Sequence, residues 1–143
     1  MKAKSIIIFF IVFLMQSCCS KLDSRIKNLQ LESDSVYYVP IDSLIDFKWD
    51  ELYIIPGPSF PCEVEEIIGV DYKKFVNDDS RLQIFLYKKK IVKEYTSRCR
   101  GLYYERPLEK GFVKYDNHSV LKIKKMRDND NDYELIIVGL LED

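Results

Sequence analysis

The chain has 143 residues, of which 47% are hydrophobic and 31% are charged, and its net charge is −1. These values suit one globular domain, and the nearly neutral balance gives no support to a nucleic-acid partner. Glycine and proline number five each, which excludes collagen-like and low-complexity chains. The ten tyrosines, eight phenylalanines and one tryptophan favour a fold rich in strands.

The first 17 residues have the pattern of an export signal. Lys2 and Lys4 form a short positive region, and the apolar run Ile6–Met15 follows it. A helix that spans a bilayer needs about 20 apolar residues, so this run is too short for a stable anchor. We therefore predict that residues 1–17 are a signal peptide.

The signal ends in Met15-Gln16-Ser17-Cys18, which resembles the lipobox of bacterial lipoproteins. The resemblance implies a diacylglyceryl group on the Cys18 sulfur and a place in the cell envelope, anchored to a bacterial membrane by lipid. In a Gram-negative cell this would be the outer membrane. An ordinary secretory signal cut near Ser17 or Ser20 and a marginal membrane helix are the alternatives.

Residues 18–35 are polar and contain neither proline nor glycine. We interpret them as the lipidated N-terminus and a tether, in which a short helix could form, and we place the folded domain at 36–143. The triplets that contain Ser35 and Ser43 resemble acceptor sites of bacterial O-glycosylation. Whether either serine carries a glycan is left open.

The segment FKWDELYIIPGP, residues 47–58, contains a run that is apolar on both faces. This pattern predicts a strand buried on both sides and ended by Pro56-Gly57-Pro58. The faces carry Phe47, Trp49, Tyr53 and Ile55 on one side and Leu52 and Ile54 on the other.

A short helix is predicted next, with Ser59 as its N-cap and Pro61 in its first turn. Val64, Ile67 and Ile68 form its apolar face, and Gly69 can end it.

Beyond the helix, apolar residues alternate with polar ones, and turn signals recur every 8–12 residues. The candidate strands are 82–87, 91–97, 101–105, 112–116, 120–126 and 133–140. We predict an α+β domain in which an antiparallel meander of five or six strands carries one short helix packed on one face.

The FKWDELYIIPGP segment and the helix after it resemble small uncharacterised exported proteins and lipoproteins that share a Phe-x-Trp-Asp-x-Leu-Tyr-Ile motif. The resemblance implies no activity. We interpret Trp49 and Tyr53 as core residues and Asp50 as an acceptor for buried backbone N–H groups at the start of the strand. A ligand site at these residues is the alternative.

Cys62 and Cys99 are the cysteines that lie within the predicted domain. In an exported chain two such cysteines more often form a bond than stay free, so we predict a Cys62–Cys99 disulfide. Two buried free thiols are the alternative. We interpret Cys19 as an exposed cysteine that has no structural role or that pairs with another chain. One histidine and no Cys-x-x-Cys argue against a metal, and we expect no cofactor.

Three further features could carry chemistry. His118 is predicted in an exposed turn, and no Gly-x-Ser-x-Gly motif presents a serine to it. Asp128, Asp130 and Asp132 imitate part of a calcium loop, but the later positions do not fit, so we predict a solvated hairpin loop. Lys122 and Lys124 alternate with Leu121 and Ile123 and are predicted to lie on the solvent-exposed face of a strand, and a basic patch that faces anionic headgroups or an acidic partner is the alternative.

The sequence has a signal peptide with a lipobox-like end and no recognisable set of catalytic residues. This combination favours a non-enzymatic, lipid-anchored envelope protein with a binding or scaffolding role. Its membrane contact is expected through Cys18, and a protein partner would be additional. An inhibitor or immunity-type lipoprotein and a small hydrolase are the alternatives.

Overall fold

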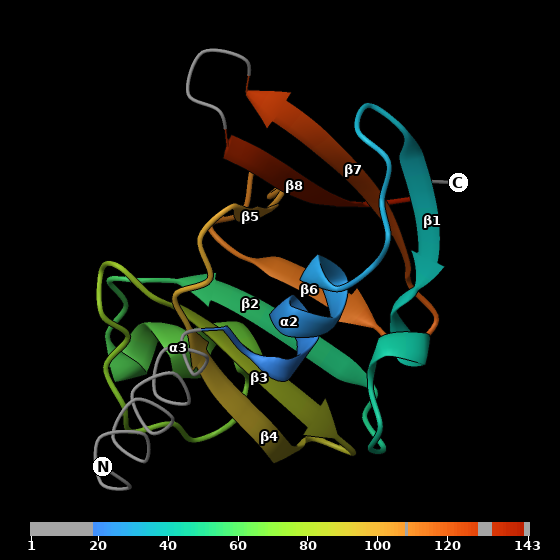
Figure 1. The fold of residues 1–143 in the computed structure, drawn as a ribbon. Coiled ribbons are helices and arrows are strands. Elements are labelled where there is room, and N and C mark those ends of the chain that lie inside the picture. The colour runs from blue at the N-terminus through green and yellow to red at the C-terminus, as the bar shows by residue number, and fades with distance from the viewer. Residues whose placement is uncertain (1–18, 108, 129–132, 142–143) are drawn as a thin grey trace, which may run out of the picture.

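The computed structural model describes residues 19–107, 109–128 and 133–141 (Figure 1). Within these residues the chain forms two four-stranded sheets, and every strand pair is antiparallel except β5–β8. Sheet A has the order β1 (Val36–Pro40), β7 (Val120–Asp128), β8 (Tyr133–Leu140), β5 (Leu102–Tyr104). Sheet B has the order β4 (Lys90–Ser97), β3 (Arg81–Tyr87), β2 (Glu51–Pro56), β6 (Val113–Asp116).

The predicted α+β class is confirmed, but the single meander of five or six strands is wrong. The described residues form eight strands, because the chain changes sheet more than once. It leaves sheet B after β4, forms β5 in sheet A, returns to sheet B as β6 and then completes sheet A. Since β5 joins β8 without a direct hairpin between them, the two strands can run parallel.

Strand β2 confirms the prediction of a strand buried on both sides. Leu52 and Ile54 belong to the core between the two sheets, whereas Tyr53 and Ile55 belong to the core beneath α3 (Pro61–Ile68). Phe47 and Trp49 precede the strand and pack with the inter-sheet core, so their predicted place on the Tyr53 face is wrong. The molecule therefore has three layers: sheet A, sheet B and α3 on the outer face of sheet B (Figure 1).

Helix α3 begins one residue later than predicted. Phe60 is its N-cap residue, and the Phe60 N–H donates to Glu63 Oε2 at 2.7 Å. Ser59 instead pairs with Val76 and donates its hydroxyl to the Pro56 carbonyl. The predicted helix end is confirmed, because Gly69 adopts φ 70°, a left-handed conformation that glycine accepts without strain.

The tether predicted for residues 18–35 is wrong over most of its length. Residues Lys21–Lys27 form helix α2, whose Ser20 N-cap accepts a hydrogen bond from the Asp23 N–H. Leu22 and Ile26 are 2% and 0% exposed and join the inter-sheet core. Burial of two such side chains contributes several kcal/mol, about 1.5–3 kcal/mol each, which holds the helix to the domain. A short 3₁₀ helix, η2 (Ile41–Leu44), packs in the same core.

The predicted Cys62–Cys99 disulfide is also wrong. The structure joins Cys19 to Cys99, whose Cα atoms lie 4.5 Å apart, and Cys62 is a free, exposed thiol on α3. The reason is the fold of α2: it brings the N-terminal segment against the residues that follow β4, while α3 lies on the outer face of sheet B. Cys19, interpreted from sequence as a bystander, is thus a structural residue.

Across the described ranges, the helices are all too short or too polar to cross a bilayer.

Candidate functional site

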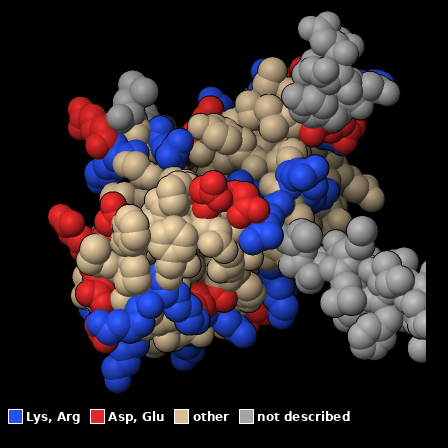
Figure 2. All heavy atoms as spheres, turned by 90° about the vertical axis from the view of Figure 1, so that its left-hand side faces the viewer, with Lys and Arg blue, Asp and Glu red and all other residues tan. Residues whose placement is uncertain are grey.

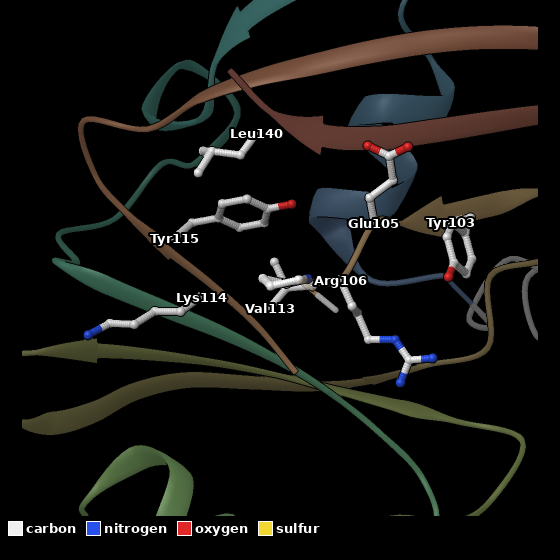
Figure 3. A pocket seen from close by; sticks show the side chains of 8 residues that line it. Tyr103, Glu105, Arg106, Val113, Lys114, Tyr115 and Leu140 are labelled. Atoms are coloured by element: carbon white, nitrogen blue, oxygen red, sulfur yellow. The ribbon is translucent and has the colours of Figure 1, made fainter. Parts of the chain in front are cut away.

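A cleft of about 460 Å³ opens between the two sheets where strands β5 and β6 run close to each other (Figure 3). A smaller hollow of about 100 Å³ adjoins it, since both are lined by Tyr103, Arg106 and Val113. The segment that links β5 to β6 forms part of the wall, so one stretch of chain supplies side chains from both sheets. The remaining lining residues of the larger cleft are Glu105, Pro107, Lys114, Tyr115 and Leu140.

Tyr115 is the most unusual of these residues. It is 2% exposed, and its hydroxyl has no hydrogen-bond partner in the described part of the chain. Burial and the nearby Glu105 carboxylate raise the pKa of Tyr115 well above its usual value, so the hydroxyl keeps its proton. Figure 3 shows the ring reaching into the cleft from β6, with the hydroxyl toward the side on which Glu105 lies. An unsatisfied buried hydroxyl costs about 1–3 kcal/mol of stability.

Glu105 is placed by strand β8. Its backbone N–H donates to the Val138 carbonyl at 2.8 Å. Its carboxylate lies against Gly139, where an added Cβ would come within 2.4 Å of Glu105 Oε2. Any residue larger than glycine at 139 would therefore move this carboxylate away from its present position.

The cationic side chains around the cleft differ in whether they form ion pairs with carboxylates of the domain. Lys114 lies 2.9 Å from Glu51 Oε1, and this hydrogen bond raises the pKa of the lysine. Arg106 is exposed and has no ion-pair partner among the described residues. Arg106 is therefore the cation that remains available to a ligand.

A buried polar cluster supports the inner end of the cleft. Its centre is Asp23 of α2, which is 0% exposed. The carboxylate accepts hydrogen bonds from the side chains of four residues on β3, β4 and β5. These donors are Gln83 Nε2 at 2.8 Å, Tyr104 Oη at 2.5 Å, Ser97 Oγ at 2.5 Å and Arg81 Nη2 at 3.2 Å. A buried carboxylate is tolerated when it is paired and hydrogen-bonded in this way.

Arg81 connects this cluster to the cleft. Its guanidinium donates to the carbonyl of Leu102 at 2.9 Å and to that of Cys99 at 3.2 Å, and it also lies 5.1 Å from the centre of the Tyr104 ring. The same side chain lines the smaller hollow, and its Nε–H is buried without a hydrogen-bond partner. Helix α2, the Cys19–Cys99 bond and the hollow are therefore held together through one side chain.

Tyr104 acts in this cluster as a neutral donor. Burial, followed by the adjacent Asp23 carboxylate, raises the pKa of Tyr104 well above its usual value. Its hydroxyl therefore stays protonated and directs its hydrogen to Asp23 over the whole neutral range.

Most of the residues interpreted from sequence lie away from the cleft. Trp49 is 2% exposed and Tyr53 is 5% exposed, so their predicted core role is confirmed. Asp50 accepts the backbone N–H of Lys88 at 2.9 Å, but this bond is exposed and Asp50 Oδ1 is buried without a partner in the described residues, so its predicted role as an acceptor for buried donors is not confirmed. His118 lies in the exposed turn between β6 and β7, as predicted.

Other predicted features lie at the edge of what the structure describes or beyond it. Residues 129–132, the middle of the calcium-like loop, and Cys18 are outside the described residues. Lys122 is exposed while Leu121 and Ile123 are buried, which confirms the predicted alternation on β7. The Ser43 hydroxyl donates to the Pro40 carbonyl at 2.7 Å, and its glycosylation stays a prediction.

Sequence reasoning missed the cluster around Asp23 and the cleft. A signal for α2 was present, because Ser20 followed by Asp23 three residues later is a capping pattern, and Leu22, Ile26 and Leu29 have helical spacing. Nothing comparable marked Tyr115, because a tyrosine in an alternating strand looks like an ordinary core residue.

The chain matches no family model, no curated protein and no solved structure. Its function is therefore inferred from the residues and their geometry.

Proposed function

We propose that this chain is a lipid-anchored cell-envelope protein that binds a ligand in the cleft between its sheets and catalyses no reaction there. The observation that carries the binding role is the Tyr115 hydroxyl, which is buried, unpartnered and directed into a cleft. Proteins rarely keep such a group without a use, because pairing it or replacing it with phenylalanine would stabilise the domain. The lipobox-like segment ending in Cys18 supports the anchored location.

The chemistry of the cleft favours binding over catalysis. The raised pKa of Tyr115 makes it a neutral hydrogen-bond donor and a poor nucleophile. Lys114 is committed to Glu51, and His118 is not among the residues that line the cleft. The groups that face a ligand are therefore suited to hold and orient it.

The fold of the N-terminal segment sets how such an anchor would hold the domain. Cys18 is the neighbour of Cys19 in sequence, and adjacent Cα atoms are about 3.8 Å apart. Cys19 is bonded to Cys99, so no length of free chain separates an acylated Cys18 from the folded body. An anchored domain would lie against the bilayer, whereas the tether expected from sequence would have allowed it to stand away.

Charges of both signs lie on the surface of the domain. On the face shown in Figure 2, basic and acidic side chains are interspersed around an uncharged area. Ion pairs of this kind include Lys73, which lies 2.7 Å from Asp71 and 3.1 Å from Glu65. Because the two signs compensate each other, acyl chains on Cys18 would supply most of the membrane affinity.

The anchor is tested by growing a bacterial host that expresses the full chain with labelled palmitate. We expect label on the chain, loss of label in Cys18→Ala and full label in the control Cys62→Ala. Label that persists in Cys18→Ala, or a mature chain without acyl groups by mass spectrometry, would contradict the anchor.

The binding role is tested by placing the photoreactive residue p-benzoylphenylalanine at Tyr103, which is 48% exposed at the cleft, or at Tyr38, which is 56% exposed on β1. After illumination of the native envelope, we expect a small-molecule adduct at position 103 and none at position 38. Equal labelling of both positions, or no adduct at 103, would contradict a ligand in the cleft. A stoichiometric protein adduct at 103 would replace this proposal with the inhibitor-type alternative.

A further inference from the structure

We infer that the cleft takes a small amphiphilic acid, in which one carboxylate or phosphate group ends an apolar body. This inference rests on the proposed function, because it assigns a ligand class to the same cleft. It depends on how donors, acceptors and apolar side chains are distributed between the hollow and the larger cleft.

The acid group fits the smaller hollow. Arg81 and Arg106 line it, with Tyr103 and Tyr104 beside them. The charge of Arg81 is compensated by Asp23 at 3.2 Å, but its Nε–H is buried and unpartnered. Arg106 adds a positive charge that is without an ion-pair partner in the described residues. The hollow thus carries a net positive charge from Arg106, and carboxylate and phosphate bind at guanidinium groups.

Glu105 sets the direction in which an acid would lie. In Figure 3 its carboxylate and the Arg106 guanidinium point to opposite sides, as neighbouring residues of an extended chain do. The Glu105 carboxylate is held near β8 by its contact with Gly139. An anion is therefore repelled at the Glu105 end and attracted at the Arg106 end, so the acid group must enter toward Arg81.

The apolar body fits the larger cleft. Val113 lines both spaces and joins them, and Pro107 and Leu140 continue the apolar surface. Leu140 and Tyr103 are 44% and 48% exposed, so a ligand body that covered them would remove apolar surface from water. A cleft of about 460 Å³ is in the usual range for a small ligand. Tyr115 offers one hydrogen-bonding group along the path of this body.

The test uses the mature chain with Cys18→Ser, which lacks acyl chains and retains every described residue. Calorimetry compares four probes that share an eight-carbon chain: octanoate, octyl phosphate, 1-octanol and octyltrimethylammonium. Acetate and inorganic phosphate serve as acids without a body. We expect saturable binding of octanoate, octyl phosphate or both, and at least about tenfold weaker binding of the neutral, cationic and short probes. The ratio of octanoate to octyl phosphate affinity then identifies the acid group.

Variants connect the binding to the residues. Arg106→Gln should weaken acid binding about tenfold, and Arg106→Lys should weaken it less, because lysine keeps the charge and loses the planar fork. Lys122→Gln on β7 is the matched control, since it removes one exposed charge outside the cleft, and it should leave affinity unchanged.

Two results would overturn the inference. One is 1-octanol or octyltrimethylammonium binding as tightly as octanoate, and the other is no saturable binding of either acid at millimolar concentration. Both are distinguishable from failure of the proposed function. A neutral small-molecule adduct at position 103 in the envelope would support the binding role and contradict only the acidic ligand class. An unacylated Cys18 would contradict only the lipid anchor.

Discussion

Asp23 shows how one buried carboxylate can fix the position of a chain segment. Helix α2 has only seven residues, too few to be stable in isolation. Its burial against the sheets is held in register by donors on three different strands that converge on this one side chain. Breaking such a buried, charged network leaves donors without acceptors, which is among the costliest single changes in a small domain.

We therefore predict that Asp23→Asn lowers the free energy of unfolding by about 3 kcal/mol, because the Arg81 charge is left buried without its partner. Urea denaturation followed by circular dichroism measures the change. Asp46→Asn is the matched control: Asp46 pairs with Arg25 at 3.0 Å but is 56% exposed, so its loss should have a much smaller effect. Equal effects of the two variants would show that the Asp23 network has no special role.

Two buried tyrosines allow a second comparison at the level of single hydroxyls. The Tyr104 hydroxyl donates to Asp23 at 2.5 Å, whereas the Tyr115 hydroxyl is without a partner in the described residues. We predict that Tyr104→Phe lowers the free energy of unfolding by about 2 kcal/mol and that Tyr115→Phe raises it by about 1 kcal/mol. Thermal unfolding of the ligand-free chain measures both. A destabilising Tyr115→Phe would mean that the hydroxyl already has a partner and would remove the main support for the cleft as a site.

At the scale of elements, the disulfide and helix α2 act together. Cys19 lies just before the N-cap of α2, and its bond to Cys99 closes a loop with a sequence separation of 80. A loop of this length is expected to stabilise the fold by about 4 kcal/mol through the entropy of the unfolded chain.

We predict that Cys99→Ser lowers the free energy of unfolding by about that amount and increases hydrogen exchange in residues 20–27 more than in β2, because α2 then depends on packing alone. Cys62→Ser should leave both quantities unchanged, since this thiol is free and exposed on α3. If Cys62→Ser is as damaging as Cys99→Ser, the pairing in the protein is not Cys19–Cys99.

The elements also show what sequence could and could not provide. Strand β2 and the end of α3 were predictable, because a two-faced apolar run and a glycine after an amphipathic segment are local signals. The division into two sheets was not predictable. The strands that pair with β1 and β5 lie far along the chain, and the sequence of a short edge strand does not indicate which sheet it joins. The wrong disulfide for Cys99 follows from the wrong prediction at α2. A tether at residues 18–35 would hold Cys19 away from the domain, whereas the folded helix brings Cys19 to Cys99.

The candidate site was less predictable than the fold. Arg81, Arg106 and Tyr115 come from three different segments, and what matters about them is which hydrogen bonds they lack. A sequence pattern identifies residue types and their spacing along one element. It contains no information about a hydroxyl that is buried without a partner, because that property depends on every neighbour in three dimensions.

For the whole molecule, the buried tyrosines determine how stability responds to alkaline pH. The pKa of Tyr72 is raised to about 12, mainly by burial, and burial also raises the pKa values of Tyr104 and Tyr115. In the unfolded chain tyrosines have a pKa of about 10. Above this pH the unfolded chain releases tyrosine protons that the folded chain still binds, and this difference favours unfolding. The contribution of these tyrosines to stability is therefore fully present below about pH 10, the pKa of the unfolded chain. It is lost as the pH rises through their pKa values in the folded chain.

We predict that the free energy of unfolding is flat from neutral pH to about pH 9 and then falls steeply. Urea titrations at a series of pH values measure it. In Tyr72→Phe the fall should be shallower between about pH 10 and 12, and Tyr38→Phe, which alters an exposed tyrosine, is the control. A curve that is identical in all three chains would contradict the assignment.

The Cys19–Cys99 bond also has a mechanical consequence. A force applied between residue 18 and a residue that follows Cys99 would pass through the two sulfur atoms, and the backbone between these two cysteines would be bypassed. That segment includes β2, β3, β4 and both described α-helices. A protein held by a lipid on the neighbouring cysteine and pulled at a residue that follows Cys99 would therefore leave its bilayer with this part of its backbone bypassed.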